Sequence, residues 1–279
     1  MGRRYCYGTV YEMIGRVIEM TKVVIRVSFT VFLLTFSSLG LPLAWGTVHV
    51  PILLYHRIGA VATDSMTVTT TLFEHQLKYL RDNGYRVIPL KELTDYYLEN
   101  GQAPRPHSVV ITVDDGHISV YRDMFPLVRK YHIPVTLFIY PSAISNAAYA
   151  MTWGQLRDIK ETKLFDFQSH TFWHPNFKKE KIRLRPVEYE SFVGIQLRKS
   201  KEKLEKELNV KVNMLAWPFG IHDDDLIHRA TEAGYVAAFT MERHPAGTLD
   251  SVMALPRYLV TNGEKGGAFT TILAAATEG

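Results

Sequence analysis

Short apolar runs alternate with amphipathic segments along most of the chain. Seven such runs are predicted strands: 52–56, 109–114, 135–140, 165–170, 213–219, 236–240 and 255–260. Most are apolar throughout, which is typical of strands buried on both faces of a parallel sheet. Segments with a helical period lie between them: 72–83, 121–131, 153–161, 187–208 and 225–233. The repeated strand–helix order predicts an α/β fold, either a barrel or a doubly wound sheet.

The chain after residue 46 contains no low-complexity linker and no break in composition. We therefore predict one domain over residues 47–279. The predicted helix 187–208 carries the charge run RKSKEKLEKEL, which could suggest a site for a polyanion. Its acidic and basic residues interleave at helical neighbour spacing, so a solvated, salt-bridged face is the better interpretation.

The N-terminal 46 residues have the pattern of an export signal. An apolar stretch begins at Val27 after two basic residues, and Ala44 and Gly46 provide small residues at the −3 and −1 positions of a cleavage site. Serine, glycine and proline interrupt the stretch, whereas a spanning helix needs about 20 apolar residues. We predict a signal peptide over residues 1–46, with Met20 as an alternative start and an uncleaved anchor as the alternative structure. The mature protein is then expected in the periplasm, the cell envelope or the extracellular space.

Composition and charge narrow the class of protein further. The 279 residues are 47% hydrophobic and 22% charged, which is ordinary for a globular protein. The net charge of +4 lies mostly in residues 1–46, so the predicted domain is close to neutral and carries no nucleic-acid footprint. Because the chain has a single cysteine, Cys6, an internal disulfide and a zinc site built from cysteines are excluded. Cys6 itself falls in the predicted signal. No protein partner can be inferred from the sequence.

Two clusters of polar residues follow predicted strands. Asp114 and Asp115 lie at the end of one apolar run. The alternative to a functional role is an N-cap for a following helix, but a cap would account for only one of the two aspartates. His170 and His174 follow another run, four residues apart. Ligands of α/β folds bind at the carboxyl ends of strands, where these groups are expected to meet. Two histidines and one carboxylate form a usual open catalytic set for zinc, although the histidine spacing alone is a weak signal.

Three further runs carry polar or aromatic residues within them or near their ends. Tyr55 and His56 close the first run, Trp217 and Phe219 belong to the WPFG segment, and Arg257 lies in the last run. Packing alone predicts no such concentration of polar and special residues at strand ends.

Three motifs, in this order and spacing, resemble those of the polysaccharide deacetylases of the NodB-homology type, carbohydrate esterase family 4: TVDDG (112–116), SHTFWHP (169–175) and AWPFG (216–220). The resemblance extends from about residue 50 to residue 262 and implies an irregular (β/α)7 TIM-like barrel. The family's last strand carries a histidine near the C-terminus, whereas here ILLYH (52–56) stands near the N-terminus. This order is similar to the circularly permuted poly-β-1,6-N-acetylglucosamine deacetylases of biofilm formation.

The resemblance implies a role for each matching residue. Asp114 would be the catalytic base, and Asp115, His170 and His174 would bind a divalent metal, zinc first, with nickel and cobalt as alternatives. In the permuted order His56 would be the general acid.

Departures from the family pattern concern the supporting residues. Ala216 stands where the family has an arginine that holds the base, and Arg257 is the candidate to replace it. The acid that orients the family's histidine has no match, because the aspartates at 223–225 are typical of a helix N-terminus.

The resemblance also implies groups that contact the substrate. The backbone N–H of Phe219 would stabilise the oxyanion. Three aromatic residues, Tyr55, Trp173 and Trp217, are candidates to stack on sugar rings, with core packing as the alternative for Trp217.

These observations predict a metal-dependent enzyme that removes N-acetyl groups from a polysaccharide containing N-acetylglucosamine, with poly-β-1,6-N-acetylglucosamine as one substrate. Chitin oligomers, peptidoglycan and acetylated xylan are alternative substrates. A glycoside hydrolase that uses Asp114 and Asp115 is a competing interpretation, but adjacent carboxylates cannot easily flank a glycosidic bond at ~5–9.5 Å separation. The second competing interpretation is a carbohydrate-binding relative that has no catalytic activity.

Overall fold

The computed structural model describes residue 16 and residues 49–274. The predicted signal segment, 1–46, lies outside the described residues apart from Arg16, so its prediction stays a prediction. The described residues 49–274 belong to one compact unit. Within the described part of the chain, no helix combines the length and the apolar character that a membrane crossing needs.

Parallel strands form the centre of this unit. The hydrogen-bonded path runs in the order β10 (Tyr258–Leu259), β1 (Ile52–Tyr55), β5 (Ser108–Asp115), β6 (Val135–Ile139), β7 (Phe165–Ser169), β8 (Met214–Ala216) and β9 (Ala237–Phe239). All of these pairs are parallel. A parallel bridge between Phe239 and Leu255 links β9 to the segment that leads into β10. The predicted α/β barrel of seven strands is therefore confirmed.

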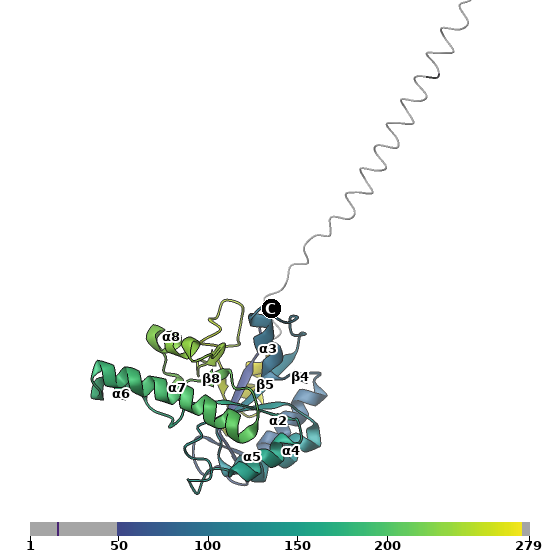
Figure 1. Ribbon diagram of the computed structural model, residues 1–279. Helices are drawn as coiled ribbons and strands as arrows, with labels where there is room; N and C mark the ends of the chain where they lie inside the picture. Colours follow the sequence, from purple (N-terminus) through teal and green to yellow (C-terminus); the bar gives the residue numbers. More distant parts are fainter. Residues whose placement is uncertain (1–15, 17–48, 275–279) are drawn as a thin grey trace, which may run out of the picture. The chain divides into compact units, whose positions relative to one another are not determined.

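Helices pack around the strands, most of them on the outside (Figure 1). They are α2 (Thr70–Asp82), α3 (Leu90–Tyr97), the π-helix η1 (Val120–Met124), α4 (Phe125–Tyr131), α5 (Trp153–Lys160), α6 (Phe177–Arg183), α7 (Pro186–Leu208), the 3-10 helix η2 (Pro218–Gly220), α8 (Asp224–Glu232) and α9 (Gly267–Ala274). Asp223 caps α8 by accepting the Leu226 N–H, which confirms that the aspartates at 223–225 start a helix.

The strands divide the apolar residues into an inner and an outer core. In β5, Ile111 and Val113 belong to the outer cluster beneath the helices, whereas Val110 belongs to the inner cluster with Phe138. Side chains alternate between the two faces of a strand, so Asp114 shares the inner face with Val110. This alternation places a carboxylate at the carboxyl end of the barrel interior, at a fully buried position.

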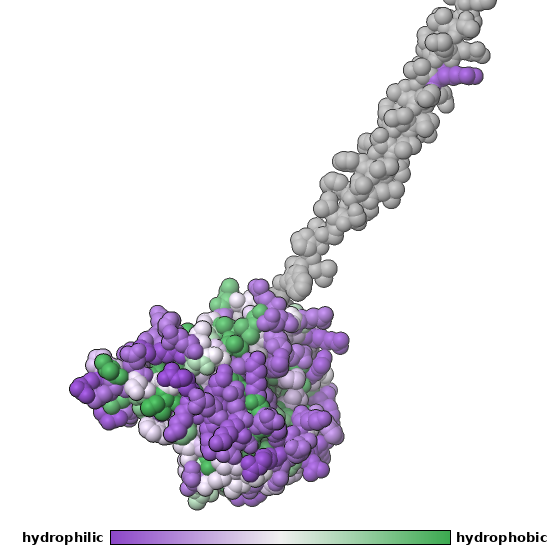
Figure 2. Space-filling model, viewed as in Figure 1, coloured by the Kyte–Doolittle hydropathy of each residue, from purple (hydrophilic) through white to green (hydrophobic). Residues whose placement is uncertain are grey.

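Some elements were not evident from apolar runs. The short strands β2 (Arg57–Gly59) and β3 (Thr67–Thr69) form a separate pair, and β4 (Arg86–Val87) pairs with β5. Each of these strands has only two or three residues, which is too short to form a recognisable apolar run in the sequence. The face shown in Figure 2 is mostly hydrophilic, with only small apolar patches, as expected for helices that turn their apolar sides inward.

Candidate active site

A cavity of about 280 Å³ opens at the carboxyl ends of the strands. Its lining residues come from six separate segments: His56, Met66, Asp114, Asp115, His170, His174, Phe219 and Met241. Six of these eight were expected at the site from the sequence. The fold therefore brings together residues that lie far apart along the chain, at the end of the sheet where α/β proteins bind ligands.

Backbone conformation at this cavity is unusual. Among the described residues that are not glycine, ten have positive φ, and three of these ten line the cavity: Asp115 (φ 77°), His174 (φ 61°) and Phe219 (φ 58°). Such conformations cost about 1–3 kcal/mol each for residues with a side chain and tend to cluster at functional sites. Three of the eight cavity-lining residues thus have a strained backbone where the polar side chains converge.

Asp115, His170 and His174 form a compact cluster. The Nε2 atoms of His170 and His174 lie 3.7 and 3.9 Å from Oδ1 of Asp115. One potential ligand atom from each residue lies within 4.8 Å of the other two. Ligands of a tetrahedral zinc ion, at ~2.1 Å from the metal, are ~3.4 Å apart. The observed separations therefore fit a single divalent cation after small side-chain movements.

The protonation states of these groups also suit a cation. Nδ1 of His170 lies 2.8 Å from the carbonyl oxygen of Ala216, so this nitrogen carries the proton and Nε2 keeps its lone pair. Burial lowers the pKa of His170 to about 3, so the imidazole is neutral at physiological pH. Burial raises the pKa of Asp115, an effect that a nearby positive ion would oppose. The three residues could thus hold a divalent metal.

Asp114 is held by Arg257 at a fully buried position. Nη1 and Nη2 of Arg257 each donate a hydrogen bond of 2.8 Å to one carboxylate oxygen, and Nε donates to the carbonyl of Thr240 at 3.0 Å. Burial alone would raise the pKa of Asp114, but the charge and hydrogen bonds of Arg257, together with the nearby imidazoles of His170 and His56, outweigh burial and lower the pKa to about 2. Asp114 is therefore a carboxylate at any physiological pH.

His56 follows β1 and lines the same cavity. Its Nδ1 is buried and has no hydrogen-bond partner among the described residues. The sequence offered no acid to orient this histidine, and the structure places none against Nδ1. No carboxylate among the described residues therefore fixes the ring of His56 through Nδ1.

The aromatic candidates divide into two groups. Trp173 and Phe219 are 54% and 56% exposed, so their rings are accessible to a ligand. Tyr55 and Trp217 are fully buried, and their polar atoms donate to Gln76 and to the Met253 carbonyl. Sugar stacking by Tyr55 was therefore a wrong prediction, and for Trp217 the alternative, core packing, is the one that the structure supports. Strand-end residues that face the outer core point beneath the helices.

Three residues near the cavity were not expected. Met66 and Met241 line it from loops whose position depends on the fold, so no sequence pattern indicated them. Tyr140 directly follows β6, and its ring centroid lies 5.4 Å from that of His174. The position just after a buried strand, which identified the aspartates and His170, would also have found Tyr140.

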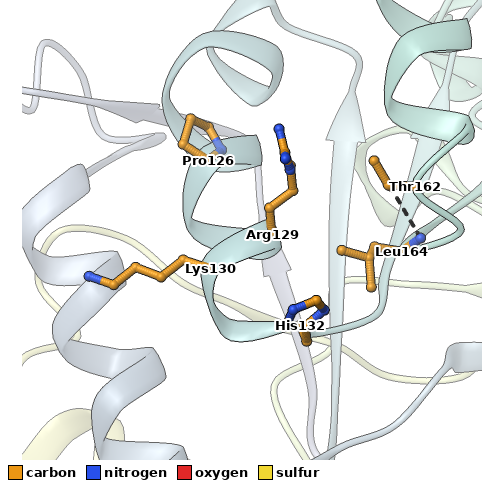
Figure 3. Close-up of a pocket in the computed structure, with 6 residues that line it drawn as sticks. All are labelled: Pro126, Arg129, Lys130, His132, Thr162 and Leu164. Carbon is orange, nitrogen blue, oxygen red and sulfur yellow. Dashed lines mark hydrogen bonds between the residues drawn. The ribbon is translucent and has the colours of Figure 1, made fainter.

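A second hollow lies at the opposite ends of the strands. Figure 3 shows its lining, which comes from α4 and from the residues before β6 and β7: Pro126, Arg129, Lys130, His132, Thr162 and Leu164. Lys130 is paired with Glu74, and the Arg129 guanidinium lies over the Phe125 ring. The residues that line the hollow include no carboxylate, and Thr162 Oγ1 donates a hydrogen bond to the Ile159 carbonyl, so the chemistry is assigned to the cavity around Asp114.

Comparisons with known proteins point to polysaccharide deacetylases. The family model described as polysaccharide deacetylase matches residues 101–238. The poly-beta-1,6-N-acetyl-D-glucosamine N-deacetylase of Staphylococcus epidermidis is 29% identical over 219 residues, which are 77% of this chain and 74% of that protein.

Solved structures share the fold. The Streptococcus pyogenes deacetylase PplD, in complex with acetate, aligns with a TM-score of 0.72 and 24% identity over 81% of this chain and 99% of that one. IcaB from Ammonifex degensii aligns with a TM-score of 0.72 and 24% identity over 82% of this chain and 97% of that one. At this level of identity, both likenesses establish the fold.

Proposed function

The chain belongs to the polysaccharide deacetylase family, and on that premise we propose that it removes acetyl groups from the N-acetylglucosamine residues of poly-β-1,6-N-acetylglucosamine. The enzyme class, a hydrolase of amide carbon–nitrogen bonds, follows from the family. The choice of glycan is supported by the named activity of the Staphylococcus epidermidis relative. The observation that carries the catalytic role is the pairing of a buried, ionised Asp114 with the cluster of Asp115, His170 and His174.

The family is metal-dependent, and we assign the cation to Asp115, His170 and His174. The imidazole and carboxylate donors suit zinc first, with nickel and cobalt as alternatives. A cation bound there would lower the pKa of water and polarise the acetyl carbonyl. The neutral His170 supports this assignment, because a protonated imidazole could not be a ligand.

Asp114 acts as the general base in this proposal. It accepts a proton from the attacking water as that water adds to the acetyl carbon. Arg257 keeps the carboxylate ionised and fixes its plane through two hydrogen bonds. A two-carboxylate glycoside hydrolase is disfavoured on geometry instead, because adjacent residues such as Asp114 and Asp115 cannot easily flank a glycosidic bond at the ~5–9.5 Å separation that this chemistry needs.

His56 and Phe219 complete the reaction. The departing sugar amine is a poor leaving group unless it is protonated, and His56 is the group in the cavity that can supply the proton. The backbone N–H of Phe219, in its left-handed turn, donates to the developing oxyanion. The exposed rings of Trp173 and Phe219 are suited to pack against the apolar faces of sugars.

We further propose that the enzyme is exported, with residues 1–46 as its signal peptide. A polymeric substrate outside the cell requires an enzyme on the same side of the membrane. The apolar stretch and the small residues before the predicted cleavage site support this location.

The decisive experiment measures acetate release from a panel of N-acetylated glycans, with and without a chelator. We expect the protein to act on β-1,6-linked N-acetylglucosamine oligomers, and chelation should abolish the activity until a divalent metal is restored. Greater activity on chitin oligomers, peptidoglycan or acetylated xylan would correct the substrate. Sugar binding without acetate release, in protein loaded with metal, would instead identify a non-catalytic relative.

A further inference from the structure

Two aromatic rings beside the cavity have no part in the chemistry described above. The rings of His117 and Tyr149 lie within 12° of parallel, with centroids 6.3 Å apart. Tyr149 is 47% exposed, and His117 follows Asp115 by two residues. We infer that these rings form a subsite for a neighbouring sugar of the same polysaccharide chain. This inference rests on the proposed function and adds the group that distinguishes a polymer from a single acetylated sugar.

The two rings are held in place before any substrate arrives. The Ile118 N–H donates to the Tyr149 carbonyl at 2.7 Å, and the Met151 N–H donates to the Gly116 carbonyl at 3.0 Å. These bonds join the segment after β6 to the segment after β5. A surface already ordered in the free protein loses little conformational entropy when a ligand binds.

Tyr140 connects this surface to the reaction centre. The hydroxyls of Tyr140 and Tyr149 lie 2.9 Å apart, and the Tyr140 ring lies beside that of His174. One side chain therefore separates the exposed ring of Tyr149 from a proposed metal ligand. A sugar on Tyr149 would lie next to the sugar being deacetylated, as adjacent units of one chain do.

Arg57 has one hydrogen-bond donor without a partner at the same edge. Its Nε is buried and has no partner among the described residues, while its Nη1 is paired with Asp64. The next residue, Ile58, donates its N–H to Ser119 Oγ at 3.1 Å, and that oxygen lies 2.8 Å from Nδ1 of His117. The strand that carries Arg57 is thus tied to the aromatic pair.

This combination matches the chemistry of a pyranose. Axial C–H groups give a sugar ring an apolar face, and its hydroxyls accept hydrogen bonds at the edge. An exposed aromatic face beside an N–H donor that has no partner among the described residues meets both needs. If the Tyr149 ring served only to pack its loop, burial would be expected, whereas almost half of the residue is open to solvent.

The test compares Tyr149→Ala with Tyr149→Phe, using acetate release from a β-1,6-linked N-acetylglucosamine pentasaccharide by metal-loaded protein. Loss of the ring should raise KM roughly tenfold and leave kcat within about twofold. The phenylalanine variant keeps the ring and should behave like the wild type. Ile182→Ala, which truncates another exposed apolar side chain, should change neither constant. Melting temperature and metal content are measured for every variant, to separate binding from folding.

Three outcomes would overturn the subsite. An unchanged KM in folded Tyr149→Ala would show that the ring does not bind substrate. Equal losses in the alanine and phenylalanine variants would mean that the hydroxyl bond to Tyr140 matters instead of the ring. Wild-type protein that releases acetate from no glycan of the panel would overturn the proposed function and the subsite together, whereas an active wild type with a normal Tyr149→Ala would overturn the subsite alone.

Discussion

Arg257 holds Asp114 through two parallel hydrogen bonds of 2.8 Å, although 143 residues separate them in the sequence. Arg257 precedes β10 and Asp114 belongs to β5, and both strands pair with β1. The N-terminal strand therefore lies between the two elements that carry the ion pair. Both side chains are buried, so each charge depends on the other for compensation.

We first predict the effect of breaking this pair. Arg257→Met leaves a buried, uncompensated carboxylate and should lower the free energy of unfolding by about 3–5 kcal/mol. Asp114 has a lowered pKa in the folded state, so its contribution to stability is present above its unfolded pKa of ~3.9 and is lost as the pH falls toward about 2. Denaturant unfolding at pH 7 and pH 3 measures both effects.

The control for this prediction removes both charges. Arg257→Met with Asp114→Asn should recover part of the stability while remaining inactive, because burying two neutral groups costs less than burying one charge. A single Arg257→Met variant as stable as the wild type would contradict the prediction.

The second prediction concerns Asp114 itself. Asp114→Asn should retain the metal but lower kcat by about 10²–10⁴-fold, because an amide cannot accept the proton of the attacking water. Metal analysis and acetate release are measured on the same sample. Loss of metal with substantial remaining turnover would mean that Asp114 and Asp115 have exchanged roles.

The third prediction concerns His174. His174→Ala should lower metal content and acetate release together while the fold is retained, because only two of the three proposed ligands remain. His228→Ala is the matched control, since this histidine is exposed on α8 and should affect neither quantity. Full metal occupancy together with full activity in His174→Ala would remove this residue from the site.

The sequence was most informative where chemistry and strand ends coincide. Asp114, Asp115 and His170 each lie at or just after a long apolar run, and the rule that parallel strands share a carboxyl end was enough to bring them together. Arg257 was proposed only as a substitute for a missing arginine. Its contact depends on the order β10–β1–β5, which no local pattern encodes.

Two physical causes explain what the sequence analysis did not predict. Tyr55 and Trp217 also lie at or after strand ends, but their side chains are buried within the outer core. A strand run that is apolar on both faces gives no signal for which side faces the barrel interior. Met66 and Met241 lie in loops, where only the three-dimensional fold decides which side chains reach the cavity.

The last prediction concerns His56, whose Nδ1 lacks a partner in the described part of the protein. If His56 protonates the leaving amine, His56→Ala should depress kcat far more than it raises KM, because this interaction is made mainly in the transition state. It should also remove the alkaline limb of the pH profile, since that limb would report loss of the imidazolium proton.

The alternative is that His56 only fills the mouth of the barrel. In that case His56→Gln would change stability modestly and leave the chemistry intact, because glutamine preserves much of the volume and polarity. Comparing kcat–pH profiles of the wild type, His56→Ala and His56→Gln, after checking that each is folded and metal-loaded, separates the two roles. A near-normal kcat with an unchanged alkaline limb in His56→Gln would refute the general-acid role. Because the proton must still reach the amine, another group or bulk water would then have to supply it.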